Sequence, residues 1–351
     1  ISNLRPVFVL YKTLYEVNAM KKVITLKNPV AITAFSCVGG KKEGDGPLSA
    51  GFDEICRDDY FGMKSWEKAE TEMQKRSIRR LFSKRNINEN DVSVAIGGDL
   101  CDQITSTAFA YRDISMPFLG QYTACATMAQ SLAVGSVLVS RGAVANALVG
   151  ASSHFCTAER QFRTPLDYGG KRTPTAQWTV TGSAHAFLEP VGKGPFITSV
   201  SFGQIVDLGI TDANNMGARM APAAAKTIGD FFIETGKRPE DYDGIFTGDL
   251  GAVGSDLLKD LMFKEYKIQL KNHNDCGLLI FDKEKQKVQS GRSGRGCSGC
   301  VLASYILPKL ISGRYKKVLF VATGAMLSPT TTMQKESIPS IAHLVEISKE
   351  K

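Results

Sequence analysis

Cys125 is the residue in this chain that is best placed to do chemistry. It follows a short loop, residues 120–124, and opens a helical pattern that runs to Arg141. At a helix N-terminus the unpaired backbone N–H groups and the positive end of the helix dipole favour a thiolate, the nucleophilic form of cysteine. The position therefore predicts a sulfur that attacks carbonyl carbon. A small buried apolar residue is the alternative interpretation of a cysteine in this place.

The chain repeats this arrangement. The strand pattern of residues 92–100 ends in Gly-Asp-Leu, and residues 242–250 end in the same way. In the second copy Cys297 occupies the place that Cys125 has in the first. A repeat of about 150 residues is far longer than a solenoid unit, so it predicts the duplication of a whole α/β half.

The local patterns predict strands that alternate with helices. Such alternation indicates largely parallel sheets covered by helices on both faces. Apolar residues recur on one face of residues 66–85, as in a helix that lies on a sheet. From periodicity and turn residues we predict strands over 29–35, 177–188 and 196–206, helices over 66–85 and 215–235, and a glycine-rich loop over 39–47.

Composition bounds the class of protein. The 351 residues are 43% hydrophobic and 22% charged, which is typical of a globular chain. The net charge of +8 indicates either a solvated surface or attraction to an anionic membrane face or acidic small molecules. Nucleic-acid binding is disfavoured, because no basic helix is interleaved with aromatic residues. Cys297 and Cys300 have no second cysteine pair to complete a zinc site, so we expect no metal.

The chain divides into two halves and a short extension. No apolar run reaches the roughly 20 residues of a membrane helix, and the first 19 residues lack a signal-peptide cleavage site. We therefore expect peripheral membrane association at most. We interpret residues 1–19 as an extension outside the fold, followed by halves at 20–206 and 207–351.

These patterns resemble the thiolase-like superfamily. In that superfamily two βαβαβαββ halves pack into five αβαβα layers, and the nucleophilic cysteine starts the central helix of the first half. Cys125 matches that position. The resemblance implies an α/β protein with the thiolase-like fold.

A closer resemblance covers about residues 27 to 347. The strings at residues 42–48, 152–163, 173–182, 275–277 and 324–329 are similar to the stage V sporulation protein AD family of endospore-forming bacteria. The resemblance implies binding of dipicolinic acid, pyridine-2,6-dicarboxylate, alone or as its calcium chelate. It also implies roles in the uptake of this acid into the developing spore and in its release at germination. Expected partners are membrane-embedded proteins of the same sporulation operon at the spore inner membrane, and we also consider a homodimer.

The residues that condensing enzymes need beside the cysteine are missing. Thiolase-like enzymes use two further polar residues, at least one of them histidine, to move protons and hold the thioester oxygen. Here Ser293 and Asp249 fall at the expected histidine positions. We therefore interpret Cys125 as a vestigial nucleophile on a pocket floor. An acyltransferase that uses Cys125 on an unknown acyl thioester is the alternative, and a scaffold with an empty pocket is a third.

A receptor for a flat dicarboxylate should offer guanidinium groups for the carboxylates and an aromatic wall for the ring. Residues 154–178 are rich in both, although a structural ion pair with Glu159 or Asp167 would explain an arginine there equally well. The predicted ligand-binding residues are Cys125, His154, Arg160, Arg163 and Trp178.

Overall fold

The computed structural model describes residues 22–163 and 172–351, without the side chain of Arg163. The expectations for residues 1–19 and for the side chain of Arg163 therefore lie outside the described part of the chain. All other predicted site residues lie within it.

Each half of the chain follows the order βαβαβαββ. The first half consists of β1 (Val23–Gly39), α3 (Trp66–Arg85), β3 (Ala95–Asp99), α4 (Thr105–Ile114), β4 (Phe118–Gly120), α5 (Thr127–Ser140), β5 (Ala147–Ser153) and β7 (Gly182–Glu189). The second consists of β8 (Phe196–Ser201), α7 (Met216–Thr235), β9 (Gly244–Gly248), α8 (Gly251–Tyr266), β10 (His273–Asp275), α10 (Arg295–Val301) continuing to α11 (Leu307–Ile311), β12 (Lys317–Ala325) and β13 (Ser340–Ser348). The second repeat thus begins with β8 at Phe196, ahead of the predicted boundary at residue 207.

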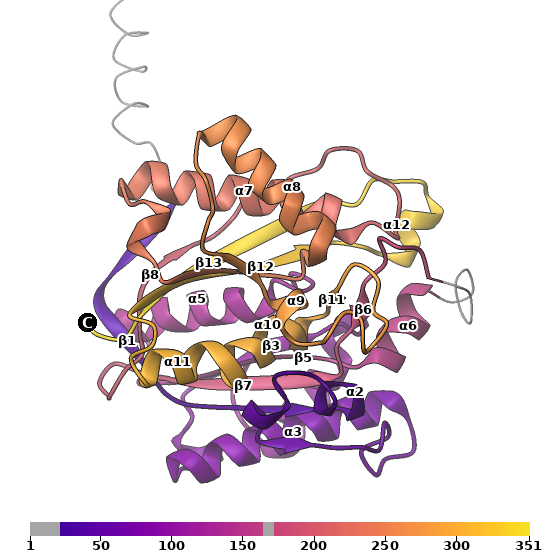
Figure 1. The fold of residues 1–351 in the computed structure, drawn as a ribbon. Coiled ribbons are helices and arrows are strands. Elements are labelled where there is room, and N and C mark those ends of the chain that lie inside the picture. Colours follow the sequence, from indigo (N-terminus) through magenta and orange to yellow (C-terminus); the bar gives the residue numbers. More distant parts are fainter. Residues whose placement is uncertain (1–21, 164–171) are drawn as a thin grey trace, which may run out of the picture.

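The halves stack into the five predicted layers, which Figure 1 shows from α3 at the bottom to α7 and α8 at the top. The strand order is β10-β9-β12-β13-β8-β1-β7-β5-β3-β4. Antiparallel pairing of β1 with β8 joins the two halves of this sheet. The sheet therefore wraps around a central layer that holds α5, α10 and α11.

Short elements between the main ones surround the candidate site. They are β2 (Glu54–Ile55), α6 (Phe155–Arg163), β6 (Trp178–Thr179), α9 (Cys276–Leu279), β11 (Arg292–Ser293) and α12 (Pro329–Met333). The glycine-rich loop predicted over residues 39–47 also contains one helical turn, α2 (Lys41–Gly44). Periodicity did not reveal α2, because four residues are too few to show a helical repeat.

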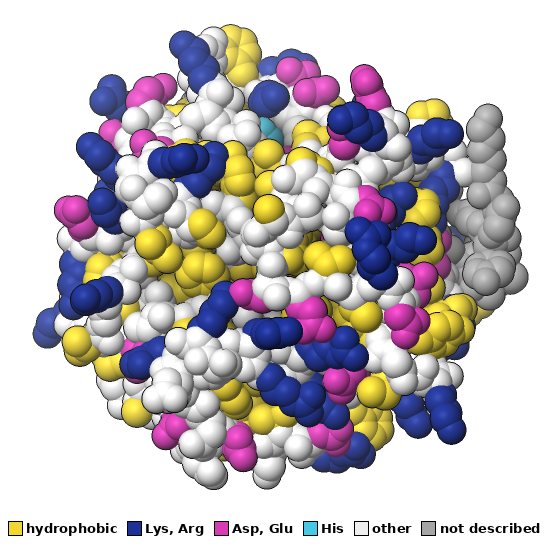
Figure 2. Space-filling model, turned by 60° about the horizontal axis from the view of Figure 1, so that its bottom comes forward, with side chains coloured by type: hydrophobic (Ala, Val, Ile, Leu, Met, Phe, Trp, Pro, Cys, Tyr) yellow, Lys and Arg dark blue, Asp and Glu magenta, His cyan; other side chains and the backbone are white. Residues whose placement is uncertain are grey.

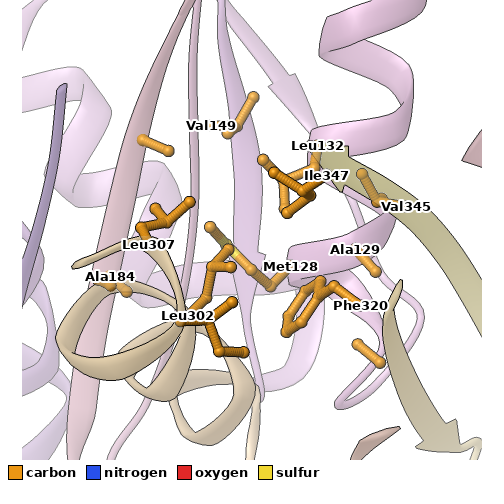
Figure 3. Packing of buried hydrophobic residues seen from close by; sticks show 14 of the residues in the cluster. Met128, Ala129, Leu132, Val149, Ala184, Leu302, Leu307, Phe320, Val345 and Ile347 are labelled. Atoms are coloured by element: carbon orange, nitrogen blue, oxygen red, sulfur yellow. The ribbon is translucent and has the colours of Figure 1, made fainter. Parts of the chain in front are cut away.

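The core lies between the two halves of this sheet. Figure 3 shows Leu132 of α5 and Leu302 after α10 among side chains from both halves, including Val149 of β5 and Phe320 of β12. All four are fully buried. A helix that is apolar on nearly every side can only be stable when it is enclosed, so α5 requires both halves.

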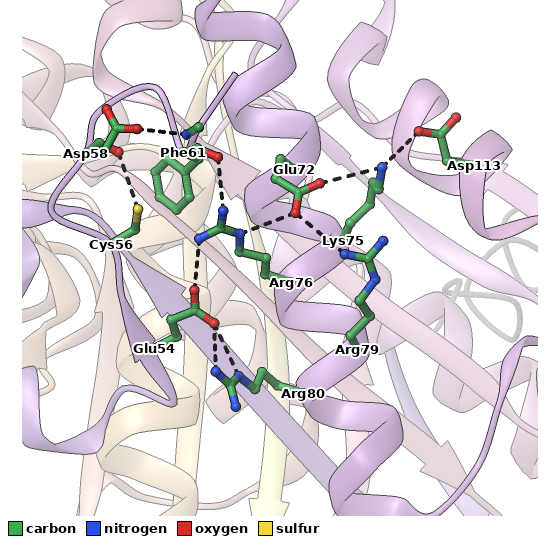
Figure 4. Close-up of polar contacts among 11 residues, drawn as sticks. Glu54, Cys56, Asp58, Phe61, Glu72, Lys75, Arg76, Arg79, Arg80 and Asp113 are labelled. Carbon is green, nitrogen blue, oxygen red and sulfur yellow. Dashed lines mark hydrogen bonds and ion pairs between the residues drawn. The ribbon is translucent and has the colours of Figure 1, made fainter. Parts of the chain in front are cut away.

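The predicted helix over residues 66–85 is confirmed as α3. Ser65 caps it, and Met73, Ile78 and Leu81 are buried against the sheet. Its outer face carries an ion-pair network in which Arg76 reaches Glu54 at 3.0 Å (Figure 4). Acidic side chains accompany the Lys and Arg side chains on the face shown in Figure 2, as expected of a solvated surface.

Leu132→Ala should lower the free energy of unfolding by about 2–5 kcal/mol, because it leaves a cavity in a close-packed layer. Leu257→Ala, at a site that is 37% exposed on α8, is the matched control and should cost far less. Urea unfolding of both variants measures the difference. Equal losses would contradict a core centred on α5.

Candidate functional site

Cys125 lies in the turn between β4 and α5, two residues before the helix begins at Thr127. The turn is held by Thr127, whose hydroxyl donates to the carbonyl of Ala124 at 2.8 Å. Ala124 has φ 47°, a left-handed conformation that costs energy for a residue with a Cβ. Strand β12 packs against this turn so closely that a Cβ on Gly324 would lie 2.2 Å from the carbonyl oxygen of Thr123. The thiol is thus fixed by backbone geometry rather than by the helix itself.

Asp249 is the polar residue that faces this thiol. It follows β9 with φ 69°, is fully buried, and interacts with the thiols of both Cys125 and Cys297. Neither carboxyl oxygen accepts a hydrogen bond of ordinary geometry from a described residue. The two thiols therefore interact with this carboxyl group only weakly. Asp275 fixes the turn, because its carboxylate accepts from the N–H groups of Leu250 at 3.0 Å and Gly251 at 2.9 Å.

The surroundings keep Cys125 protonated. Burial and then Asp249 raise the pKa of the Cys125 thiol well above its usual range, and the N–H of Gly294 and the guanidinium of Arg295 offset only part of this. The expectation of a thiolate is therefore wrong. Removal from water and a neighbouring carboxyl outweigh the dipole of α5. Burial, with Asp275 nearby, also raises the pKa of Asp249.

A small pocket with a volume of about 70 Å³ lies over Cys125. Since one water needs roughly 10–15 Å³ of such space, the pocket holds about five to seven waters or a small ring compound. Most of its lining is apolar: Leu100, Tyr122, Ala124, Cys125, Ala158, Phe162, Thr179, Met216, Met220, Ser293, Ala325 and Leu327.

The strand pair β6–β11 separates this pocket from a second one. The strands are parallel, with Trp178 opposite Arg292 and Thr179 opposite Ser293. Because successive side chains of a strand point to opposite faces, Thr179 and Ser293 line the Cys125 pocket while Trp178 lines the other. We call the second one the outer pocket. It is lined by Lys41, Lys42, Glu43, Asp45, Asp59, His154, Phe155, Cys156, Trp178 and Thr181.

His154 belongs to the outer pocket, and both of its ring nitrogens are occupied. Nε2 lies 2.8 Å from the carbonyl oxygen of Asp59, and Nδ1 accepts from the N–H of Cys156 at 3.2 Å. Burial lowers the pKa of His154, so the ring is neutral and donates from Nε2. The structure therefore gives this histidine a position-holding role.

The other predicted ligand residues are not gathered around Cys125. Arg160 pairs with Glu67 and lies over the ring of Trp66. Trp178 stacks on Phe155 in the outer pocket with 4.4 Å between ring centres. The structure thus brings His154 and Trp178 together, leaves Arg160 outside both pockets, and places Cys125 on the far side of β6–β11.

Sequence reasoning missed Arg295. Its side chain is fully buried, and its guanidinium lies 3.9 Å from the ring centre of Tyr122, a residue that lines the Cys125 pocket. Nη1 reaches the carbonyl of Gln121 at 3.4 Å, whereas Nε and Nη2 have no partner among the described residues. The sequence does contain one signal for this residue, because Arg295 is a charged residue between two glycines at the start of a helix.

Cys297 and Cys300 lie within α10, where Cys297 interacts with Asp249 and Cys300 with Cys37. His273 is bound to the hydroxyl of Thr247 at 2.8 Å.

One group within the described part of the chain has metal-ligating residues close together. Glu70, Asp99 and Cys101 offer ligand atoms within 4.8 Å of one another, all buried. Calcium takes six to eight oxygen ligands, and Arg295 adds a positive charge nearby. These residues therefore fit a resident calcium ion poorly.

The fold and the cysteine pocket define a thiolase-like protein. The structure is similar to that of 3-oxoacyl-[acyl-carrier-protein] synthase III from Aquifex aeolicus VF5, with a TM-score of 0.53 and 9% identity over 91% of this chain and 99% of that one. It is also similar to cerulenin-bound OleA from Xanthomonas campestri, with a TM-score of 0.57 and 12% identity over 92% of this chain and 98% of that one. At these identities the likeness concerns the fold alone.

Sequence comparison identifies the family within this class. The family model for stage V sporulation protein AD (SpoVAD) matches residues 20–348. Stage V sporulation protein AD of Bacillus subtilis (strain 168) is 41% identical over 324 residues, which cover 92% of this chain and 95% of that protein. The chain belongs to the stage V sporulation protein AD family.

Alkylation of Cys125 by iodoacetamide should still accelerate above pH 9, because the thiolate forms only above the raised pKa. Asp249→Asn should move this profile to lower pH, since it removes the carboxyl group whose ionised form raises the pKa of the thiol. Peptide mass spectrometry at pH 7 to 10 measures both rates. Asp256→Asn, at an exposed position on α8, is the control. Identical profiles for the two variants would show that Asp249 does not control the thiol.

Proposed function

We propose that this protein is a non-catalytic binding protein for dipicolinic acid, which occupies the pocket over Cys125. It would serve the uptake of this acid into the developing spore and its release at germination. Family membership supplies the sporulation context. The observation that carries the choice of binding over catalysis is Asp249, a buried carboxyl group beside a protonated thiol where a condensing enzyme needs a base.

Condensation needs groups that the described lining of this pocket does not supply. A thiol must lose its proton to become acylated, and the carbanion that follows must be stabilised by donors to the thioester oxygen. Asp249 favours the neutral thiol, and Ser293 supplies one hydroxyl at the wall of the pocket. The alternative, acyl transfer through Cys125, would require a ligand that shifts this thiol from its neutral form to the thiolate.

The pocket suits a small aromatic acid. Tyr122 and Phe162 offer ring faces, while the hydroxyls of Thr179 and Ser293 stand at the β6–β11 wall. A carboxylate that leaves water must regain charge-assisted hydrogen bonds. Behind Tyr122, the guanidinium of Arg295 holds two unbonded nitrogens in a fully buried position. We propose Arg295 as the carboxylate partner, and Arg163 stays a sequence-based prediction.

The proposed partners lie in the membrane. Among the helices of residues 22–163 and 172–351, none has the length and apolar character of a bilayer span. We propose that the protein attaches peripherally to membrane-embedded products of the same operon at the spore inner membrane and receives dipicolinate or calcium dipicolinate there.

A homodimer is a further proposed assembly. The edge strand β4, whose three residues are all exposed, is the face that we assign to it.

Ala158→Leu should weaken the binding of pyridine-2,6-dicarboxylate at least about 100-fold, because the added side chain fills the Cys125 pocket. Calorimetric titration measures the loss, with pyridine-2-carboxylate as the ligand that lacks the second carboxylate. Ala108→Leu makes the same change at an exposed position of α4 and should bind as the unchanged protein does. Full affinity in a folded Ala158→Leu protein would exclude this pocket.

The protein should show no steady-state condensation of acyl thioesters above the level of Cys125→Ser. Incubation with a set of acyl thioesters, followed by mass spectrometry, tests for an adduct at Cys125. Turnover that disappears in Cys125→Ser would replace the binding proposal with the acyltransferase alternative.

A further inference from the structure

Two cations beside the outer pocket, Lys42 and Arg292, form no ion pair with an acid of the described residues. The ammonium of Lys42 donates to the carbonyl of Gln286 at 3.1 Å and lies 4.2 Å from the ring centre of Trp178. Arg292 is fully buried and donates through Nη1 to two carbonyl oxygens. Its Nε and Nη2 have no hydrogen-bond partner in the described part of the chain. A buried guanidinium with unbonded N–H groups is costly unless something else satisfies it.

Positive charge accumulates around this point. Arg172 lies 4.7 Å from the ring centre of Trp178, on the same indole as Lys42. Lys41 adds an exposed ammonium to the lining. Burial, followed by Arg292, lowers the pKa of Lys42, so the two cations repel each other.

The neighbouring acids do not cancel this charge. Asp45 pairs with Arg57, and Glu159 pairs with Arg172 at 2.8 Å. Glu43 is buried, and burial raises its pKa to about 7, so near neutral pH it is only partly ionised. Among the described residues Lys42 therefore forms no ion pair, although the carboxyl groups of Glu43, Asp45 and Asp59 also line the outer pocket.

We propose that the outer pocket is a second ligand site, which takes the oxyanion group of a small acid, a carboxylate or a phosphate, on Lys42 with Arg172 and Arg292 around it. The outer pocket has a volume of about 390 Å³, which is ample for such a group. The site lies across β6–β11 from Cys125 and does not depend on the proposed function. An incoming oxyanion would draw the ammonium of Lys42 away from the indole, and the charges of Arg172 and Arg292, which both act on Lys42, would attract it as well.

Trp178 provides a direct readout. The chain has two tryptophans, so Trp66→Phe leaves Trp178 as the only one. Titration of this protein with inorganic phosphate and with succinate, at constant ionic strength, should give a saturable change in Trp178 fluorescence. The arm that saturates at lower concentration identifies phosphate or carboxylate as the preferred group.

Lys42→Gln in the Trp66→Phe background should weaken that binding at least about tenfold, because it removes the central charge. Lys64→Gln, an exposed lysine outside the outer pocket, should leave it unchanged. Circular dichroism confirms folding. A change in Trp178 fluorescence that does not saturate would overturn the proposal. Equal affinities in the Lys42→Gln and Lys64→Gln variants would overturn it as well. Ala158→Leu should bind the oxyanion normally, which separates this result from the fate of the Cys125 pocket.

Discussion

The burial of the central helical layer between the two halves is the constraint on which the rest of the molecule depends. Helix α5 and the segment from α10 to α11 are enclosed by strands of both halves, which remain joined through β1 and β8. This packing brings the partly buried Cys125 and the fully buried Cys297 to the same place, where Asp249 interacts with both thiols. A carboxyl group and two thiols then share a space that water does not reach freely.

That dryness decides the chemistry of the site. In water a thiol at a helix start would be acidified by the backbone dipole, but the same thiol in a low-dielectric pocket beside a carboxyl group keeps its proton. A small, mostly apolar pocket beside a protonated thiol can hold a ring without attacking it. The duplicated fold is therefore compatible with a change from making carbon–carbon bonds to retaining a small molecule.

The short pair β6–β11 divides the functional surface in two. Four residues in parallel register place Thr179 and Ser293 toward the cysteine and leave Trp178 and Arg292 on the opposite face. Each face has its own character: apolar and closed on one side, aromatic and cationic on the other. Both faces belong to the same two strands. A ligand in the Cys125 pocket and a ligand in the outer pocket would therefore lie on opposite faces of the same backbone.

The sequence alone determined the duplication, the α/β class and the place of Cys125, because repeats, helical periodicity and strand alternation are local patterns that the chain displays directly. The thiolase-like architecture came from the resemblance to that superfamily. It also indicated that histidines are absent where Asp249 and Ser293 stand. It did not determine the protonation of Cys125, which depends on burial and on a residue more than 100 positions away. Nor did it separate Cys125 from His154 and Trp178, or reveal Arg295. Residues close together in sequence were expected in one site, but the pleat of β6–β11 sends neighbouring side chains to opposite faces, and only the tertiary structure decides which face meets which pocket.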